Sequence, residues 1–282
     1  MIKKKILILG KNGFLAKNLA AKLRKTDFVI IFGTRKEINQ KITVKNLLNL
    51  NLNFDYIINC AGEGTVNQSY RTKFNNDLDI TKNVISYIIN HQSNTKLIQI
   101  STASVFGNSI KKNKLKPISP YAYRKLSCEK LIIKKLQNKS LDFKILRFFS
   151  IYGNGLKKQI LWDACNKIKR KNPIFFGSGD EVRSWMHIDD FCEILIKVMN
   201  LNKTKKKIFN FCGTQTLKNK ELLLLIFKSY GTKYMPKFNL IKNKGTPDYM
   251  FIKNCDLNII KFKQKIDLTY GIKKYIKWVK KI

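Results

Sequence analysis

The sequence predicts an α/β fold in which a parallel sheet carries helices on both faces, a doubly wound arrangement. The first half of the chain alternates short apolar runs with longer amphipathic runs, which is typical of β-α-β units. The first apolar run ends in a glycine-rich turn that opens a helix. A later run, Lys96–Ser101, leads through polar residues to a helix that begins at Ser119-Pro120, an N-cap followed by a favoured first residue.

Residues 3–9 are expected to form the first strand, with a helix following to about residue 25. Between them lies Gly10-Lys-Asn-Gly13-Phe-Leu-Ala16, a G-x-x-G-x-x-A pattern. The first glycine permits a tight turn, the second lets the backbone approach a pyrophosphate, and the small third residue allows close helix packing. The helix N-terminus offers amides to the same anion. This context predicts a Rossmann-type dinucleotide site, and a plain βα turn is the alternative.

The second strand, residues 28–32, ends in Gly33-Thr-Arg35-Lys36. An acidic residue at this strand end would accept hydrogen bonds from the ribose 2′-hydroxyl of NAD. A guanidinium stands there instead, which suits a 2′-phosphate and favours NADP. Glu37 lies close enough in sequence to keep NAD possible, and basic residues are frequent enough here for Arg35 to be coincidental.

Residues 55–60 form the third predicted strand, which runs into Ala61-Gly62. Small residues at that point leave room for a dinucleotide across the sheet edge. A helix over residues 72–90 follows, and we interpret His91 as its C-terminal cap. The next predicted strands are Lys96–Ser101 and residues 142–148.

Four residues near the middle of the chain suit proton transfer. Tyr121 and Lys125 lie one helical turn apart on one face, while Ser101 and Thr102 follow a strand, where open α/β sheets bind ligands. An ammonium roughly 5 Å from a phenol stabilises the phenolate by about 3 kcal/mol at an effective dielectric near 20. Thr102 is placed to donate a hydrogen bond to the same substrate oxygen. The alternative is a tyrosine and a lysine that merely share a helix surface.

Composition describes a globular chain of 282 residues with a net charge of +38. Its six cysteines are scattered without a C-x-x-C pair, so neither disulfides nor a metal site is expected. The apolar run near the N-terminus is too short for a signal peptide and no stretch suits a membrane span, so we expect a cytoplasmic protein. Lysines spread over solvated faces explain the charge better than attraction to nucleic acid, since no dense basic block is present.

The second half is expected to contain four helices, over residues 158–169, 189–200, 218–230 and 270–280. Short strands are expected near Pro173 and over residues 249–253, with mostly loop between residues 235 and 255. We interpret His187, which precedes a helix, as structural.

With these features together, the chain resembles an extended short-chain dehydrogenase/reductase of the group that contains nucleotide-sugar epimerases, dehydratases and reductases. The motifs follow the family order over nearly the whole chain: Gly10-x-x-Gly13-x-x-Ala16, Asn59-Cys-Ala-Gly62, Ser101–Gly107, Pro120-Tyr121-x-x-x-Lys125, Leu146–Gly153, Gly177–Arg183, His187–Asp190 and Phe209–Gly213.

The resemblance implies roles for single residues. Thr102 matches the catalytic Ser/Thr, Tyr121 the acid/base, and Lys125 the lysine that holds the nicotinamide ribose. Residues implied to bind substrate are Ala103, Ser150 and Arg183, the last at the substrate's diphosphate. Residues implied to bind the cofactor are Gly10, Asn12, Gly13, Phe14, Leu15, Arg35, Cys60, Ala61, Gly62, Ser101, Tyr121, Lys125 and Phe149.

Some positions depart from the family pattern. Dehydratases of the group carry an Asp-Glu pair where this chain has Ala103 and Ser104, so dehydration is not expected. Asp77 stands where an Asn is common, and Ser150 stands where Asn is usual. Both changes alter contacts near the expected reaction centre.

The expected activity is that of an NAD(P)-dependent oxidoreductase acting on a nucleotide-activated sugar, and reduction of a 4-keto-6-deoxy sugar is the first hypothesis. A C4-epimerase with bound NAD is the alternative. A non-catalytic dehydrogenase-like protein that binds nucleotide or RNA is a third hypothesis, which the charge favours and the intact Thr102, Tyr121 and Lys125 set opposes.

The resemblance also implies a domain division and an assembly. Residues 1–153 would bind NAD(P), and residues 154–282 would form a smaller substrate-binding α/β portion interleaved with the sheet. A homodimer would form through the helices at about 73–90 and 120–138.

Overall fold

The computed structural model describes residues 3–33, 52–62, 64–71, 76–91, 94–139, 141–201 and 204–282, the side chains at 111 and 112 excepted. Its main element is a six-stranded sheet of order β2-β1-β3-β4-β5-β9, in which all neighbouring strands are parallel. The strands are β1 (Lys5–Leu9), β2 (Val29–Gly33), β3 (Tyr56–Asn59), β4 (Lys96–Thr102), β5 (Phe143–Phe148) and β9 (Ile208–Phe211). The strand order changes direction at β1, and ligands of open α/β sheets bind at such a switch point.

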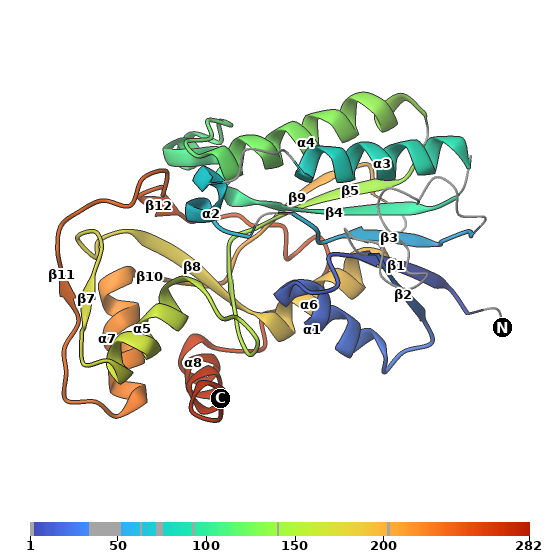
Figure 1. Cartoon of the computed structure of the whole chain (residues 1–282). Helices are drawn as coiled ribbons and strands as arrows, with labels where there is room; N and C mark the ends of the chain where they lie inside the picture. Colours follow the sequence, from blue (N-terminus) through green and yellow to red (C-terminus); the bar gives the residue numbers. More distant parts are fainter. Residues whose placement is uncertain are drawn as a thin grey trace.

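Helices cover both faces of this sheet, which confirms the predicted doubly wound arrangement (Figure 1). On one face lie α1 (Phe14–Leu23) and α6 (Ile188–Met199); on the other lie α3 (Asn76–Asn90) and α4 (Pro120–Leu136). The alternation of side chains along β1 explains the two layers. Ile6 and Ile8 pack with α1 and α6, whereas their neighbours Leu7 and Leu9 pack with α3.

The start of α4 follows from its sequence. The Ser119 side chain accepts a hydrogen bond from the Ala122 backbone N–H at 3.3 Å, and Pro120 is the first helical residue, as predicted. A shorter helix, α2 (Val66–Arg71), packs against α4. It was not predicted from the sequence. The structure describes α3 from Asn76, and the expected helix start at residue 72 lies outside the described residues.

The rest of the chain builds a smaller layered unit beside the large sheet, at the left of Figure 1. Its helices pack around a core that contains Trp185. Its helices and strands are α5 (Gln159–Lys169), α7 (Asn219–Tyr230), α8 (Leu268–Val279), β6 (Ser150–Tyr152), β7 (Ile174–Phe175), β8 (Val182–His187), β10 (Gln215–Lys218), β11 (Lys237–Phe238) and β12 (Tyr249–Met250).

Several of these short strands were not predicted. The sequence analysis missed β6, β8, β10 and β11 of this unit and β9 of the large sheet, whose partners lie far away in the chain. The strand expected over 249–253 ends at Met250, and α8 begins at Leu268, before the expected residue 270. The earlier start of α8 has a local cause, since the Asp267 side chain accepts a hydrogen bond from the Tyr270 N–H at 3.0 Å.

Residues from beyond 153 also complete the large sheet. Helix α6 covers one of its faces, and β9 pairs with β5 at its edge. The division at residue 153 remains a prediction.

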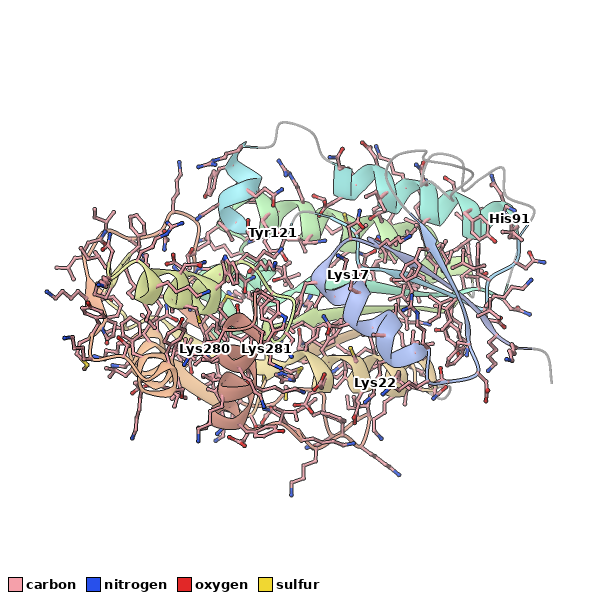
Figure 2. The ribbon with its side chains drawn as sticks, turned by 60° about the horizontal axis from the view of Figure 1, so that its bottom comes forward. Lys17, Lys22, His91, Tyr121, Lys280 and Lys281 are labelled. Carbon is pink, nitrogen blue, oxygen red and sulfur yellow. The ribbon has the colours of Figure 1, made fainter. Side chains whose placement is uncertain are left out.

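Charged side chains extend from many elements. Figure 2 labels Lys17 and Lys22 on α1 and Lys280 and Lys281 just after α8. Within the described ranges, we find no helix that combines the length and the apolar character needed to cross a membrane.

Candidate active site

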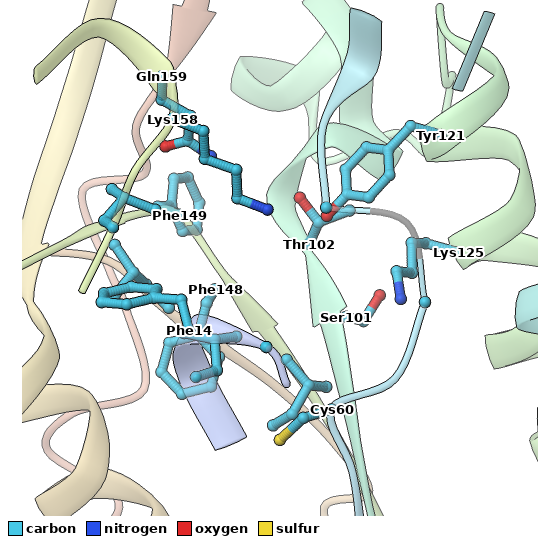
Figure 3. Close-up of a pocket in the computed structure, with 17 residues that line it drawn as sticks. Phe14, Cys60, Ser101, Thr102, Tyr121, Lys125, Phe148, Phe149, Lys158 and Gln159 are labelled. Atoms are coloured by element: carbon cyan, nitrogen blue, oxygen red, sulfur yellow. The ribbon is translucent and has the colours of Figure 1, made fainter. Parts of the chain in front are cut away.

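A pocket lies at the carboxyl ends of the central strands and contains most of the residues predicted from the sequence (Figure 3). Ten of the predicted residues line it: Gly13, Phe14, Leu15, Cys60, Gly62, Ser101, Thr102, Tyr121, Lys125 and Phe149. They come from the start of α1, the end of β3, the end of β4, the first turns of α4 and the end of β5. Segments more than 100 residues apart therefore meet in one pocket.

The glycine-rich turn forms the floor between β1 and α1. Gly10 has a φ of +90°, and a Cβ there would lie 3.0 Å from the backbone of Cys60 and Ala61. The Gly13 N–H donates to the Gly10 carbonyl at 2.7 Å, which closes the turn. No acidic side chain occupies the first turn of α1, so its free amides are open to an anion. This cradle fits the pyrophosphate of a dinucleotide.

Lys125 is held by a buried carboxylate. Its Nζ lies 3.1 Å from Oδ2 of Asp77, and the two side chains are 8% and 2% exposed. Burial is the largest single influence on the pKa of Lys125 and lowers it, but the charges of Asp77, Tyr121 and Cys128 and the hydrogen bond with Asp77 together outweigh burial, so the net effect is a raised pKa. The ammonium also donates to the Ala61 carbonyl at 3.4 Å. Lys125 is therefore a fixed cation at the pocket wall.

Gly62 is required by this ion pair. Its φ is +131°, and a Cβ there would lie 2.6 Å from Asp77 Oδ2 and 2.7 Å from Lys125 Nζ. The glycine thus gives the strand end the room in which the lysine and the carboxylate meet. It serves the site through the Asp77–Lys125 pair as well as through its position on the pocket surface.

The hydroxyls of Tyr121 and Thr102 point toward the same space, with Lys125 on the neighbouring wall (Figure 3). Tyr121 is fixed by its backbone N–H, which donates to Ser69 Oγ of α2 at 3.0 Å. The Thr102 hydroxyl donates to Ser104 Oγ at 3.2 Å and accepts from the Ser104 N–H at 3.2 Å. A substrate oxygen between the two hydroxyls would be within reach of a proton donor and acceptor.

Behind the pocket wall, Ser101 is connected to a buried ion pair. Its hydroxyl donates to Glu129, and Arg147 clasps the same carboxylate, with Nη2–Oε2 at 2.6 Å and Nε–Oε1 at 3.0 Å. Glu129 is 1% and Arg147 6% exposed. A bidentate pair of this kind fixes the rotamer of Ser101 at the strand end.

The remaining predicted residues do not line the pocket. Gly10 lies in the turn before α1, Asn12 is exposed, Ala61 and Ala103 are buried, and Ser150 lies in β6. Arg35 lies outside the described residues.

Arg183 is 6% exposed, and its guanidinium donates to the Val182 and Pro247 carbonyls at 2.8 and 2.5 Å. Burial lowers its pKa to about 10. Contact of Arg183 with a diphosphate stays a prediction.

The structure adds residues that sequence patterns did not single out. Gly64, Leu156, Lys158 and Gln159 also line the pocket. Lys158 belongs to a run of two lysines in a lysine-rich chain, so its sequence context carries no signal. Asp77 was noted only as a departure from the family, and its contact with Lys125 depends on the packing of α3 against α4.

The two histidines have structural roles, as interpreted from the sequence. His187 caps α6 by accepting a hydrogen bond from the Asp189 N–H at 3.2 Å, and burial lowers its pKa to about 4. His91 follows α3 and stacks on the Tyr87 ring at 4.2 Å. In Figure 2 it lies at the far end of the molecule from Tyr121.

Comparison with known proteins gives a family match over most of the chain. A model described as "NAD dependent epimerase/dehydratase family" matches residues 6–212. The protein named "Putative UDP-glucose 4-epimerase" from Methanocaldococcus jannaschii is 24% identical over 306 residues, which cover 98% of each chain.

Solved structures share the fold at low sequence identity. The UDP-glucose 4-epimerase of Thermotoga maritima, solved with UDP-glucose, superposes with a TM-score of 0.87 at 18% identity and covers 98% of this chain and 99% of its own. The UDP-glucuronic acid 4-epimerase of Bacillus cereus, in complex with UDP-glucuronic acid and NAD, gives 0.85 at 20% identity with the same coverage.

Proposed function

The chain belongs to the NAD dependent epimerase/dehydratase family, and we propose that it is a 4-epimerase of a nucleotide sugar that uses NAD. The observation that carries the proposal is the convergence of Thr102, Tyr121 and Lys125 on a pocket that also contains the N-terminus of α1. The relative from Methanocaldococcus jannaschii, which is matched along almost its whole length, bears the name of a 4-epimerase.

Each of these residues has a defined task in the proposed reaction. Tyr121 removes the proton of the sugar 4-hydroxyl and returns it to the same oxygen when that carbon is reduced again. Lys125 would hold the ribose of the nicotinamide, and Thr102 donates a hydrogen bond to the reacting oxygen. Bound NAD supplies the hydride acceptor and donor. Because hydride is first lost and then regained, the reaction needs no external oxidant or reductant.

The same geometry argues against water elimination by acid/base residues after β4. Ala103 is buried, and Ser104 is occupied with Thr102 through two hydrogen bonds. Neither side chain supplies a carboxyl group for the loss of a hydroxide from the sugar.

A second candidate is the reduction of a 4-keto sugar nucleotide with NADPH. The Arg35-Lys36 pair after the second strand favours it, since these cations suit a 2′-phosphate. The pair lies outside the described residues. A reductase consumes one reduced cofactor for each product, whereas an epimerase consumes none.

The experiment incubates the purified protein and NAD with a panel of nucleotide sugars and identifies the products by chromatography. We expect the C4 epimer to form with no net change in the absorbance of reduced cofactor. In a parallel incubation with NADPH and a 4-keto sugar nucleotide, stoichiometric loss of NADPH would instead establish the reductase. Tyr121→Phe should lower kcat by about 10²- to 10⁴-fold and leave NAD affinity within about threefold; an unchanged rate would refute the assigned role.

A further inference from the structure

The described side chains that line the pocket carry more positive than negative charge. Two of the described residues that line the pocket are lysines, Lys125 and Lys158, and none of the described lining residues is acidic. Lys125 is paired with Asp77 at 3.1 Å. Within the part of the chain that the structure describes, Lys158 forms no ion pair and no hydrogen bond. Among the described residues, one positive charge in the pocket therefore has no partner.

The local backbone and the neighbouring Gly64 place Lys158 in a defined position. It is half-buried at the N-cap of α5, next to Gln159, whose φ of +67° is unusual for a residue with a side chain. Its Nζ lies against Gly64, where an added Cβ would be only 2.0 Å away. Burial lowers the pKa of this lysine, and no carboxylate among the described residues opposes the effect. The lysine thus reaches across the pocket into a space that a side chain at residue 64 would fill.

The direction in which the Lys158 ammonium points indicates which part of a bound substrate it would contact. Figure 3 shows Lys158 pointing across the pocket toward Thr102 and Tyr121, on the side away from Phe14 and Cys60. Thr102 and Tyr121 are the groups proposed to act on C4. Phe14 begins α1, where the pyrophosphate of the cofactor would bind. In a nucleotide sugar the diphosphate is attached at C1, across the ring from C4, whereas C6 is attached to C5 beside C4. A cation at this end therefore lies near the substituents of the two carbons that flank C4, and of these the C6 group on C5 is the one that can be a carboxylate.

We propose that Lys158 binds the carboxylate of a nucleotide-linked uronic acid and so makes the pocket selective for sugars that carry an acid at C6. The assignment rests on the proposed reaction at C4 and names its substrate class. An ammonium that has lost part of its hydration gains most from a full negative charge, and a hydroxymethyl group offers none. Lys125 does not compete for the carboxylate because Asp77 already neutralises it.

The test compares UDP-glucuronate with UDP-glucose, which differ only at C6, so that any preference for the nucleotide cancels. Binding of each to the NAD-loaded protein is measured by calorimetry, and turnover is measured separately. We expect the wild-type protein to bind UDP-glucuronate at least about tenfold more tightly than UDP-glucose. Lys158→Gln should lower the affinity for UDP-glucuronate by about 10- to 100-fold and that for UDP-glucose by less than about threefold.

Two further variants sharpen the test. Lys157→Gln removes the adjacent lysine, which is exposed and lies over the Trp162 ring at 6.0 Å, and should leave the preference intact. Gly64→Ala keeps the charge but displaces the ammonium, and should weaken the preference for UDP-glucuronate as Lys158→Gln does.

Three results would overturn the assignment. The first is equal binding of the two sugar nucleotides by the wild-type protein, and the second is no binding of UDP-glucuronate. The third is a loss of NAD affinity in Lys158→Gln together with an equal loss of affinity for both sugar nucleotides. The last result would assign the ammonium to the cofactor diphosphate. Because binding and turnover are measured apart, selective binding without epimer formation would refute the proposed function and still support the role of Lys158.

Discussion

The buried pair of Asp77 and Lys125 provides a quantitative test of how the site is held together. At 3.1 Å and an effective dielectric of about 20, the attraction between the two charges is about 5 kcal/mol. Much of it offsets the cost of removing both ions from water. Replacing Lys125 by Met leaves Asp77, which is 3% exposed, buried without its cation. We expect a loss of about 3–5 kcal/mol in the free energy of unfolding.

This loss would be large compared with a total stability of about 5–15 kcal/mol. With a denaturant slope of roughly 3 kcal/mol per molar urea, it shifts the unfolding midpoint down by about 1–1.7 M. The measurement is urea unfolding of the cofactor-free protein, followed by circular dichroism. Lys130→Met, on the exposed face of α4, is the matched control and should change stability by less than about 0.5 kcal/mol.

A double-mutant cycle separates charge pairing from simple loss of packing. In the Asp77→Asn background the carboxylate is gone, so Lys125→Met should cost only about 1 kcal/mol. The coupling energy between the two positions should then be about 2–4 kcal/mol. If Lys125→Met is as costly in the Asp77→Asn background as in the wild-type protein, the carboxylate does not hold the lysine, and the electrostatic account of the pocket wall is wrong.

Three other predictions concern the surroundings of the site. Glu129→Gln should lower the free energy of unfolding in urea by about 3–5 kcal/mol because the buried Arg147 loses its counter-charge. Recovery of stability in the Glu129→Gln, Arg147→Met double variant would support this reason, and an unchanged stability in the single variant would contradict it. Gly62→Ala should destabilise the protein by about 1–3 kcal/mol and weaken NAD binding, because its Cβ would collide with the Asp77–Lys125 pair. NAD binding is measured by fluorescence titration, and wild-type stability and NAD affinity would show that the strand end can adjust. His187 has a folded pKa of about 4 against an ordinary 6.5, so protonation favours unfolding, and stability should fall by up to about 3 kcal/mol as pH drops from 6.5 to 4. His187→Asn, which can still cap α6, should flatten this part of a thermal-unfolding series, and an equally steep series would exclude His187 as its source.

Local sequence signals predicted much of the fold and most of the residues that line the candidate pocket. Ser119-Pro120 fixed the start of α4 because a cap and a first helical residue act on their own neighbours. Gly10 and Gly13 marked the turn into α1 for the same reason, since positive φ and close backbone approach are properties of the residue itself. Tyr121 and Lys125 share one wall of the pocket because one helical turn separates them.

Contacts between distant segments were decided by the tertiary structure. Asp77 meets Lys125 only because α3 packs on α4, and Lys158 reaches Gly64 only because the loop before α5 returns over the pocket. Short strands such as β8 and β9 gain their stability from partners far along the chain, so their own residues carry a weak signal. The sequence by itself determined the supersecondary units and the residue types that line the candidate pocket. The charge balance of the pocket depends on which buried groups face one another, and only the packing of the whole chain decides that.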